Sequence, residues 1–400
     1  MSAGGDAPSG GASEAPAVAA WRRFCRRLEA LGEELASDPF PGHAGDLTEG
    51  VAHLADQVSC WLGWALAHAD TTAPFFHRSN DLFTQWGGPN QDNVYHHARI
   101  DPRRRYRIRG QMRSCERFAL TLRVGFMHMP EWGTRKALSS PDLGIGPGDP
   151  FEICFGGDGS EPGWVEIPED VTTLSLREFY VDWQPEEPAV FTIECLDPPE
   201  SPPTRDDALL AEQLEHAWAQ VEHSMRGWND YLREHRAAAT DNTFTMHGAV
   251  AKGLAAARYA FLFWDLAPDE ALVIDTDVPD APYWGLQLAS LGWYEPIDPV
   301  HRITSLNHQQ IAVDPDGRAR IVLAHRDPGV ANWLDTGAHR DGLLTYRWFW
   351  PRSDPAPQVR VVAFDALAAL LPDDAARVSP EERRTTLRDR QAHLAWRFRT

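Results

Sequence analysis

Short strand-like stretches separated by proline and glycine constrain the fold of this 400-residue chain more than any other feature of its sequence. In these stretches polar and apolar residues alternate, or β-branched and aromatic residues predominate, as in antiparallel sheets. They fall in two regions, with VYHHARI (94–100), RYRIRG (105–110), RFALTLRVGF (117–126), FEICFG (151–156), WVEIP (164–168) and AVFTIECL (189–196) in the first, and EALVIDTDVP (270–279), YWGLQLAS (283–290), QQIAVDP (309–315), RARIVLAHR (318–326) and LLTYRWFWP (343–351) in the second. Two β-sandwiches or jelly rolls are therefore expected.

Helical periodicity occupies the segments around these regions. Apolar residues recur at intervals of three and four from Trp21 to about Ala69, with a turn at 38–46, and again from Asp206 to His235. A second helical segment is expected at about 247–264, and a charged helix from about Pro380. The predicted class is α+β, with antiparallel β-sandwich or jelly-roll modules and N-terminal and central helical segments. The predicted parts are a disordered tail (1–18), a helical segment (19–80), a first β-sandwich (81–200), a helical pair (205–265), a second β-sandwich region (266–355) and a C-terminal helical tail (356–400).

The charge balance argues against nucleic acid as a partner. The chain holds 38 Lys and Arg against 58 Asp and Glu, a formal net charge of −20, which repels a polyanion or an anionic membrane surface. The five cysteines are widely spaced, without a C-x-x-C pair, which favours a reducing cytoplasm over a disulfide framework. The N-terminal segment lacks the pattern of a signal peptide, and no run of about eighteen apolar residues predicts a membrane span.

One turn motif occurs in both strand regions. Residues 101–108 (DPRRRYRI) align with residues 314–321 (DPDGRARI), so that the Asp-Pro pair, two arginines and an isoleucine match. Asp-Pro favours a tight turn, here between a strand ending at Ile100 or Val313 and a strand with outward arginines. The motif predicts a β-hairpin in each region. Duplication of a sandwich and convergence on good turn chemistry both explain it.

The stretch 85–110 concentrates polar side chains around one predicted strand. Alternation places Val94, His96, Ala98 and Ile100 on one face and Tyr95, His97 and Arg99 on the other. His96 thus stands on an apolar face, as does His325 in the second region. Each is either a satisfied core histidine or an imidazole that faces a ligand. The preceding WGGPNQDN segment holds amide and carboxylate groups that either cap local backbone or face a ligand.

Other candidate side chains come from both regions. In LREFYVDWQ, alternation puts Tyr180 and Asp182 on one strand face, where a phenol and a carboxylate suit acid/base work or, alternatively, a structural hydrogen bond and an ion pair. The candidate catalytic residues are Asp92, His96, Tyr180, Asp182 and His325. The candidate substrate-binding residues are Asn90, Asn93, Tyr95, Arg107, Trp284, Arg302, Asn307 and Trp333.

Known local motifs for a metal, a nucleotide or an activated nucleophile are not found in the sequence. It holds no H-E-x-x-H, no Walker A or dinucleotide fingerprint and no G-x-S-x-G elbow. We therefore predict no metal site, although one assembled from distant strands stays open, and we assign no cofactor. The sixteen tryptophans either fill thick sandwich cores or line a pocket for a flat apolar ligand.

Taken together, several segments resemble one family. GGPNQDNVYHHARIDPRRRYRIRG, REFYVDWQPEEPA, YWGLQL, HRITSLNHQQIAVDPDGRARIVLAHRDPGVANWLDT and LLTYRWFWPR resemble the DUF1214 family, a bacterial domain of unknown function, over roughly residues 85–200 and 270–352. The resemblance implies β-sandwich material joined to helices and names no reaction. Its members' frequent setting in lipid and steroid metabolism favours an apolar small-molecule ligand.

These observations predict a function in the handling of small molecules. We expect an enzyme that binds a hydrophobic compound, terpenoid or steroid-like, in an aromatic-lined pocket between the sandwiches. A histidine and carboxylate pair performs isomerisation, elimination, cyclisation or hydrolysis, while arginines hold any anionic group. The alternatives are a non-catalytic binding or accessory protein that uses the same pocket, and a structural subunit of an oligomer. A homo-oligomer is compatible with each of them.

Overall fold

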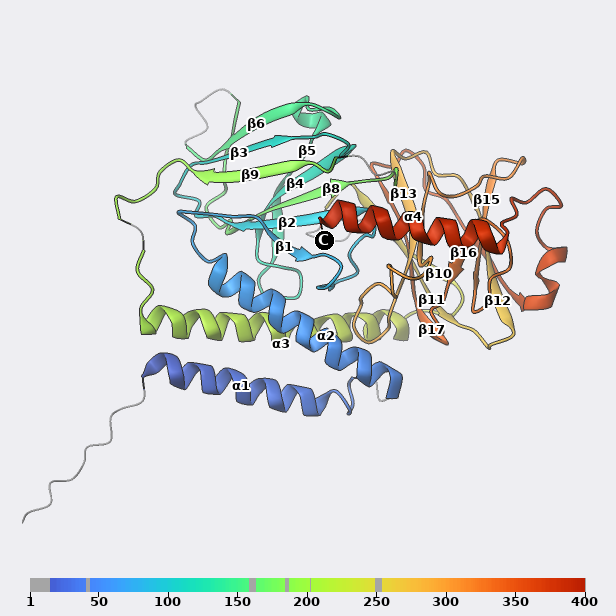
Figure 1. The fold of residues 1–400 in the computed structure, drawn as a ribbon, viewed down its shortest axis with the longest axis horizontal. Helices are drawn as coiled ribbons and strands as arrows, with labels where there is room; N and C mark the ends of the chain where they lie inside the picture. Colours follow the sequence, from blue (N-terminus) through green and yellow to red (C-terminus); the bar gives the residue numbers. More distant parts are fainter. Residues whose placement is uncertain are drawn as a thin grey trace, which may run out of the picture.

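Two β-sandwiches lie side by side, and helices pack along one side of both (Figure 1). They are seen in a computed structural model that describes residues 15–40, 44–157, 163–183, 187–201, 203–248 and 254–399. Each sandwich pairs a five-stranded sheet with a four-stranded sheet. The α+β class with β-sandwich modules is therefore confirmed.

The first sandwich contains the strands expected between residues 94 and 196, together with others. Its strands are β1 (His77–Asn80), β2 (Asn93–Arg99), β3 (Tyr106–Gln111), β4 (Arg117–Val124), β5 (Gly133–Ser139), β6 (Pro150–Phe155), β7 (Trp164–Val165), β8 (Thr173–Phe179) and β9 (Val190–Cys195). The five-stranded sheet has the order β1-β2-β8-β4-β5 with antiparallel neighbours. The four-stranded sheet has the order β7-β6-β3-β9, in which β6 and β7 run parallel.

The second sandwich repeats this arrangement. Its strands are β10 (Phe244–Gly248), β11 (Ala257–Asp265), β12 (Glu270–Asp277), β13 (Tyr283–Ala289), β14 (Ser305–Asn307), β15 (Arg318–Ala324), β16 (Trp333–Asp335), β17 (Asp341–Phe349) and β18 (Gln358–Ala363). The five-stranded sheet has the order β10-β11-β17-β13-β14, and the four-stranded sheet has the order β16-β15-β12-β18.

Alternation along the strands builds the sandwich cores. On β4, Phe118, Leu120 and Leu122 point between the two sheets and are fully buried. The side chains that alternate with them face away from this core, toward the second sandwich and the helices. Because burial of each such apolar side chain contributes roughly 2 kcal/mol, the pattern fixes which face of each strand points inward.

Helices α1 (Pro16–Glu34), α2 (Ala44–Leu62) and α3 (Asp207–Ala237) form a layer along one side of the sandwiches, and α4 (Pro380–Phe398) lies apart from them (Figure 1). Helix α2 continues into the π-helical turn η1 (Gly63–Ala67), and the short η2 (Pro141–Leu143) and η3 (Phe364–Ala369) are 3-10 turns. The Asp206 carboxylate caps α3 by accepting a 2.8 Å hydrogen bond from the Leu209 amide. Trp228 of α3 and Trp61 of α2 pack in one buried cluster with Phe261 of the second sandwich. In the described part of the chain, none of the helices has the length and apolar character needed to cross a membrane.

The Asp-Pro motif does not form the expected hairpins. β2 and β3 belong to different sheets of the first sandwich, and β14 and β15 to different sheets of the second. Each Asp-Pro segment therefore carries the chain from one sheet to the other. The hairpin prediction is wrong because a corner between sheets needs the same tight turn as a hairpin, and turn chemistry does not specify how the next strand pairs.

Four other segments also differ from expectation. The helix expected at about 247–264 is wrong, because 244–248 and 257–265 form β10 and β11; residues 249–253 lie outside the described part. Local alanine content favoured a helix there, but β11 lies between β10 and β17 and is mostly buried. Residues 358–363 form strand β18, whereas 309–315 form no strand. The disordered tail was expected at 1–18, but α1 begins at Pro16, so the prediction is wrong for 16–18. Residues 1–14 lie outside the described part.

Candidate functional site

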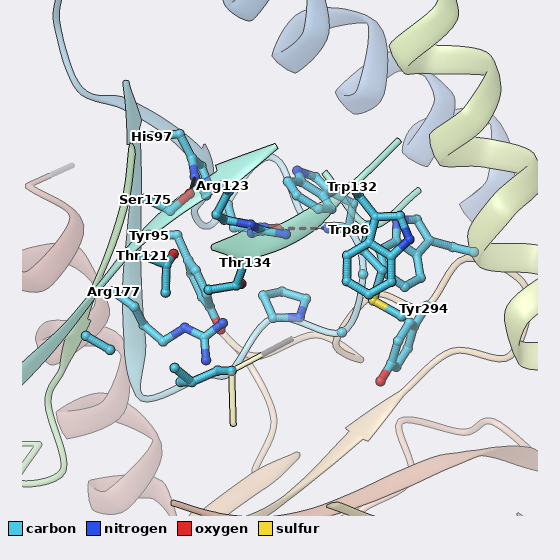
Figure 2. Close-up of a pocket in the computed structure, with 18 of the residues that line it drawn as sticks. Trp86, Tyr95, His97, Thr121, Arg123, Trp132, Thr134, Ser175, Arg177 and Tyr294 are labelled. Carbon is cyan, nitrogen blue, oxygen red and sulfur yellow. Dashed lines mark hydrogen bonds between the residues drawn. The ribbon is translucent and has the colours of Figure 1, made fainter. Parts of the chain in front are cut away.

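A cavity lies where the five-stranded sheet of the first sandwich meets α3 and the second sandwich (Figure 2). Its volume is about 170 Å³. One side is polar and comes from β2, β4, β5 and β8, while aromatic rings form the opposite side. The lining includes Trp86, Tyr95, His97, Thr121, Arg123, Trp132, Thr134, Ser175, Arg177, Trp228, Tyr231, Tyr259, Phe261, Tyr294 and Arg347.

Strand register explains the polar side. Ser175 of β8 stands directly between His97 of β2 and Thr121 of β4. Two residues further along β8 lies Arg177, and Arg123 lies two residues beyond Thr121 on β4, paired with Thr134 of β5. Because residues two apart on a strand share a face, these side chains form one patch around Ser175. We call this patch the polar floor.

Ser175 and His97 are joined at the centre of the polar floor. Ser175 Oγ lies 2.7 Å from His97 Nδ1. His97 is buried, and its Nε2 has no hydrogen-bond partner in the described part of the chain. Burial lowers the pKa of His97 well below its usual value, and the Arg123 charge lowers it further. The imidazole is therefore neutral at physiological pH.

The cavity is strongly positive. Arg123, Arg177 and Arg347 all line it, and within the described residues no carboxylate pairs with any of them or lines the cavity. The Nε atoms of Arg123 and Arg347 are buried without a hydrogen-bond partner. Burial lowers the pKa of Arg123 to about 10, and the charge of Arg177 acts in the same direction. Three guanidinium groups thus share a site to which the described residues contribute no compensating negative charge.

The remaining contacts of these arginines are weak or neutral. The guanidinium carbon of Arg177 lies 4.9 Å from the centre of the Tyr95 ring. Arg347, which comes from β17, donates from Nη2 to the Gly88 carbonyl at 3.3 Å. Neither contact neutralises a charge. The arrangement positions guanidinium groups from both sandwiches around one space.

Aromatic rings close the opposite side. Trp228 of α3 lies with its ring centre 6.4 Å from that of Trp86 and 5.6 Å from that of Tyr294. Gly87 and Gly88 both have positive φ, and a Cβ at these positions would lie 2.6 Å from Trp228 and 2.3 Å from Tyr294. The two glycines therefore allow the loop to approach this aromatic wall closely.

The candidate residues in GGPNQDN mostly join the two sandwiches instead of facing the cavity. Asp92 is buried and accepts hydrogen bonds from Trp183 Nε1 at 2.7 Å, Asn307 Nδ2 at 2.8 Å and Tyr283 OH at 2.6 Å. Tyr283 also donates to Asn90 Oδ1 at 2.9 Å. Asn307 and Tyr283 belong to the second sandwich, so we call this cluster the interdomain joint. A carboxylate with three donors is a structural acceptor here.

The C-terminal helix α4 closes over the interdomain joint. Arg390 and Arg397 place their guanidinium carbons 4.2 Å and 4.9 Å from the Trp183 ring centre. Arg390 donates to Ser305 Oγ at 2.9 Å, and Arg397 donates to the Gln91 carbonyl at 2.6 Å. The helix that was predicted only as a charged tail therefore fastens one sandwich to the other.

Two of the candidate catalytic residues, His96 and Tyr180, are linked through a third residue, Glu178. Glu178 bonds His96 Nε2 with one carboxylate oxygen and accepts from Tyr180 OH with the other. The Ala189 amide donates to Tyr180 OH at 2.9 Å. This network lies on the core side of the sheet, opposite the polar floor. Burial and the Glu178 charge raise the pKa of Tyr180, so its phenol stays protonated.

Asp182 does not share a face with Tyr180. β8 ends at Phe179, so the alternation assumed for 179–183 no longer applies. Asp182 is exposed, whereas Tyr180 is buried. The Tyr180 and Asp182 pair is therefore not formed.

The other candidates are dispersed. Asn93 donates to the Glu178 carbonyl at 2.7 Å beside the interdomain joint. Arg107 pairs with Glu194 at 2.5 Å, and Arg302 pairs with Asp335 at 3.0 Å. Trp284 fills the second sandwich core, Trp333 donates to the Ala324 carbonyl at 3.1 Å, and His325 bonds Thr336 Oγ1 at 2.8 Å. Of the candidate residues, Tyr95 lines the cavity.

Most cavity residues were missed from the sequence. Arg123, Thr121, Ser175 and Arg177 were assigned no role, since polar residues that alternate with core residues usually face solvent. A signal was present. On β4 and β8, arginines and hydroxyls share a strand face that carries no acid, unlike β3, whose Arg107 and Arg109 face Glu152 and Glu194.

A metal centre has no support within the described residues. No group of three His, Cys, Asp or Glu side chains there is arranged to hold an ion. His128, which lies in the FMHM stretch, bonds Gln220 Oε1 at 2.8 Å through Nε2. Burial lowers the pKa of His128 to about 3.

Comparisons with known proteins support the architecture. No protein-family model matches the sequence, and no curated protein sequence matches it either. An uncharacterized protein from Burkholderia cenocepacia has a crystal structure similar to this chain, with 28% identity, a TM-score of 0.81, and coverage of 87% of this chain and 97% of that protein. The VPA0106 protein from Vibrio parahaemolyticus is 12% identical, with a TM-score of 0.45 and coverage of 78% and 98%. The DUF1214 resemblance stays a prediction.

Proposed function

We propose that the protein binds a small organic anion with a flat apolar body in the cavity between the sandwiches. The charge of the cavity is the observation that carries this proposal. Arg123, Arg177 and Arg347 meet there without a carboxylate among the described residues. Removing an unpaired cation from water costs several kcal/mol, and an anion that enters the cavity offsets that cost.

The aromatic wall supports the second half of the proposal. Trp86 and Tyr294 present ring surface opposite the polar floor (Figure 2), and the Trp228 ring packs against both. A ligand with an acidic group at one end and a flat ring at the other matches both sides. Indole and phenol rings supply large contact area at low cost in conformational entropy.

The volume favours a ligand smaller than the terpenoid or steroid-like compound expected from the sequence. A cavity of about 170 Å³ is close in size to engineered cavities of roughly 150 Å³ that accept benzene. Pockets for drug-sized ligands hold roughly 300–1,000 Å³. One aromatic ring with an acidic substituent fits this space, whereas four fused rings exceed it.

Calorimetric titration of benzoate against benzyl alcohol tests the proposal. Benzoate is expected to bind and benzyl alcohol to bind at least about tenfold more weakly, because only benzoate meets the arginines. Arg177→Met is expected to abolish the difference. Arg107→Met is the matched control, because it removes an arginine of the opposite sheet that pairs with Glu194. This variant should bind benzoate like the natural protein. Equal binding of benzoate to both variants contradicts the proposal.

An enzyme is the second candidate, supported by the Ser175 and His97 contact. In such an enzyme, Ser175 Oγ attacks the carbonyl carbon of an ester, the hydroxyl proton passes to His97 Nδ1, the alcohol leaves with that proton, and water then hydrolyses the acyl-serine. The lowered pKa of His97 makes the imidazole a weak base, and this is why binding is proposed first. Mass spectrometry after incubation with p-nitrophenyl acetate separates the two candidates, since an acetyl group on Ser175 is expected only for the enzyme.

A further inference from the structure

We infer that the anionic group of the ligand is the phosphate of a phosphate monoester, bound on the polar floor with its apolar alcohol part against the aromatic wall. The inference rests on the proposed function and specifies the ligand class of the same cavity. It follows from the number, the direction and the charge of the donors around Ser175.

The donors number more than a carboxylate uses. The floor offers the hydroxyls of Ser175, Thr121 and Thr134 together with the guanidinium groups of Arg123 and Arg177. A carboxylate has two oxygens in one plane, whereas a phosphate monoester has three terminal oxygens in a tetrahedral arrangement. A phosphate therefore offers more acceptor oxygens than a carboxylate to this mixed set of hydroxyl and guanidinium donors.

The donors also come from different directions. Ser175 lies at the centre of the floor, with Thr121 beside it on β4 and Arg177 further along β8. Arg123 and Thr134 stand opposite each other on β4 and β5. Arg347 reaches the cavity from the second sandwich. A planar group aligns with one guanidinium fork at a time, while a tetrahedral group accepts from several sides.

The charge of the cavity favours a dianion. Arg123 and Arg177 are close enough for the charge of Arg177 to lower the pKa of Arg123, so the two guanidinium groups repel each other. Arg347 adds a third positive charge. A phosphate monoester carries about −1.5 to −2 at pH 7, against −1 for a carboxylate or a sulfate ester. Of these groups, only the phosphate brings enough charge to relieve the mutual repulsion of the arginines.

Neutral His97 fits the same site. Its pKa is too low for it to compete with the arginines as a cation, and in the neutral tautomer with the proton on Nδ1 it donates to Ser175 Oγ, which leaves the hydroxyl proton of Ser175 for the phosphate. Tyr95 and Trp228 line the same cavity as the polar floor. The apolar part of the ligand is therefore expected to be a small ring attached directly to the phosphate oxygen.

The test measures the equilibrium binding of phenyl phosphate, phenyl sulfate and benzoate to the full-length protein by calorimetry. We expect phenyl phosphate to bind at least about tenfold more tightly than each of the other two anions. Thr121→Val and Ser175→Ala are expected to weaken phenyl phosphate by about fivefold to tenfold and benzoate by less than about twofold. Thr192→Val, which removes a hydroxyl on β9 that bonds the Arg109 carbonyl, is the matched control and should leave all three affinities unchanged.

The outcomes separate the two proposals. Benzoate that binds as tightly as phenyl phosphate, with no effect of Thr121→Val on either, overturns the phosphate assignment and leaves the organic-anion site standing. Phenyl sulfate that equals phenyl phosphate overturns the dianion argument. Failure of all three anions to bind, with Arg177→Met indistinguishable from the natural protein, overturns both the assignment and the proposed function. Benzoate binding that is retained in Thr121→Val and Ser175→Ala shows that these two variants are folded.

Discussion

Asn307 of the second sandwich donates a hydrogen bond from Nδ2 to Asp92 Oδ1 of the first at 2.8 Å. Both residues were expected to act on a ligand. Their contact instead lies in the interdomain joint, where Trp183 and Tyr283 donate to the same carboxylate. The joint holds the two sandwiches in the arrangement that forms the cavity.

Replacing Asp92 is expected to destabilise the whole fold. Asp92→Ala leaves the Trp183 indole N–H buried without an acceptor and removes one acceptor each from Asn307 and Tyr283, so the free energy of unfolding should fall by about 3 kcal/mol or more. Urea unfolding measures this change. Asp182→Ala, at an exposed carboxylate nearby, should change it by less than about 0.5 kcal/mol. Similar losses in both variants would show that the joint does not depend on the carboxylate.

The contacts of α4 give a second stability prediction. Arg390→Ala removes the stacking on Trp183 and the hydrogen bond to Ser305, so a loss of about 1–3 kcal/mol is expected. Arg388→Ala on the exposed face of the same helix serves as the control and should have little effect. Thermal unfolding of both variants checks the difference. An unchanged transition for Arg390→Ala contradicts the assignment of α4 as a fastening between the sandwiches.

Removing a cavity arginine is expected to have the opposite effect on stability. The Arg123 Nε atom is buried without a hydrogen-bond partner, and the guanidinium has no carboxylate partner among the described residues, so Arg123→Met should leave the free energy of unfolding unchanged or raise it by up to about 2 kcal/mol. Binding of organic anions should be lost in the same variant. Chemical unfolding and calorimetry on one preparation measure both quantities. A loss of stability greater than about 1 kcal/mol would indicate a structural role for the guanidinium.

The buried histidines predict how stability depends on pH. The pKa of His97 lies well below its usual value of 6.5 in the folded protein. Between these two pKa values the unfolded chain binds a proton that the folded chain does not bind, so stability falls as the pH decreases below about 6.5. The loss is about 1.4 kcal/mol per pH unit for each such histidine.

The contribution of His97 is measured as a slope. For His97→Asn, the free energy of unfolding between pH 6 and pH 4.5 should decrease less steeply with falling pH than in the natural protein, by up to about 1.4 kcal/mol per unit. A constant loss of stability from the substitution itself does not alter this slope. Identical slopes for the two proteins would mean that His97 is protonated as readily in the folded as in the unfolded chain.

The strands and helices could be predicted from the sequence because their causes are local. Alternation of Phe118, Leu120 and Leu122 with polar residues places β4 and its buried face. The same local information placed a helix over β11, where the environment between two neighbouring strands decides the outcome. It also gave the Asp-Pro turns without the pairing that follows them.

The cavity could not be predicted because its parts are distant in the chain. Ser175, Arg123 and Arg347 come from three strands in two sandwiches. Their faces would lie in solvent if α3 and the second sandwich did not cover them. Conversely, Asp92 and Asn307 appeared to be site residues because polar groups without an evident partner often mark a functional site. Each is the other's hydrogen-bond partner, and a pairing across 215 positions is not visible in a local pattern.

The position of a bound ligand tests the central claim most directly. Crystals soaked with 4-bromobenzoate give an anomalous signal from bromine that locates the ring. We predict a bromine peak against the aromatic wall of Trp86, Trp228 and Tyr294, with the carboxylate directed toward Arg123 and Arg177. A bromine peak at another position alone, or an empty cavity at saturating ligand, would contradict the assignment of this cavity as an organic-anion site.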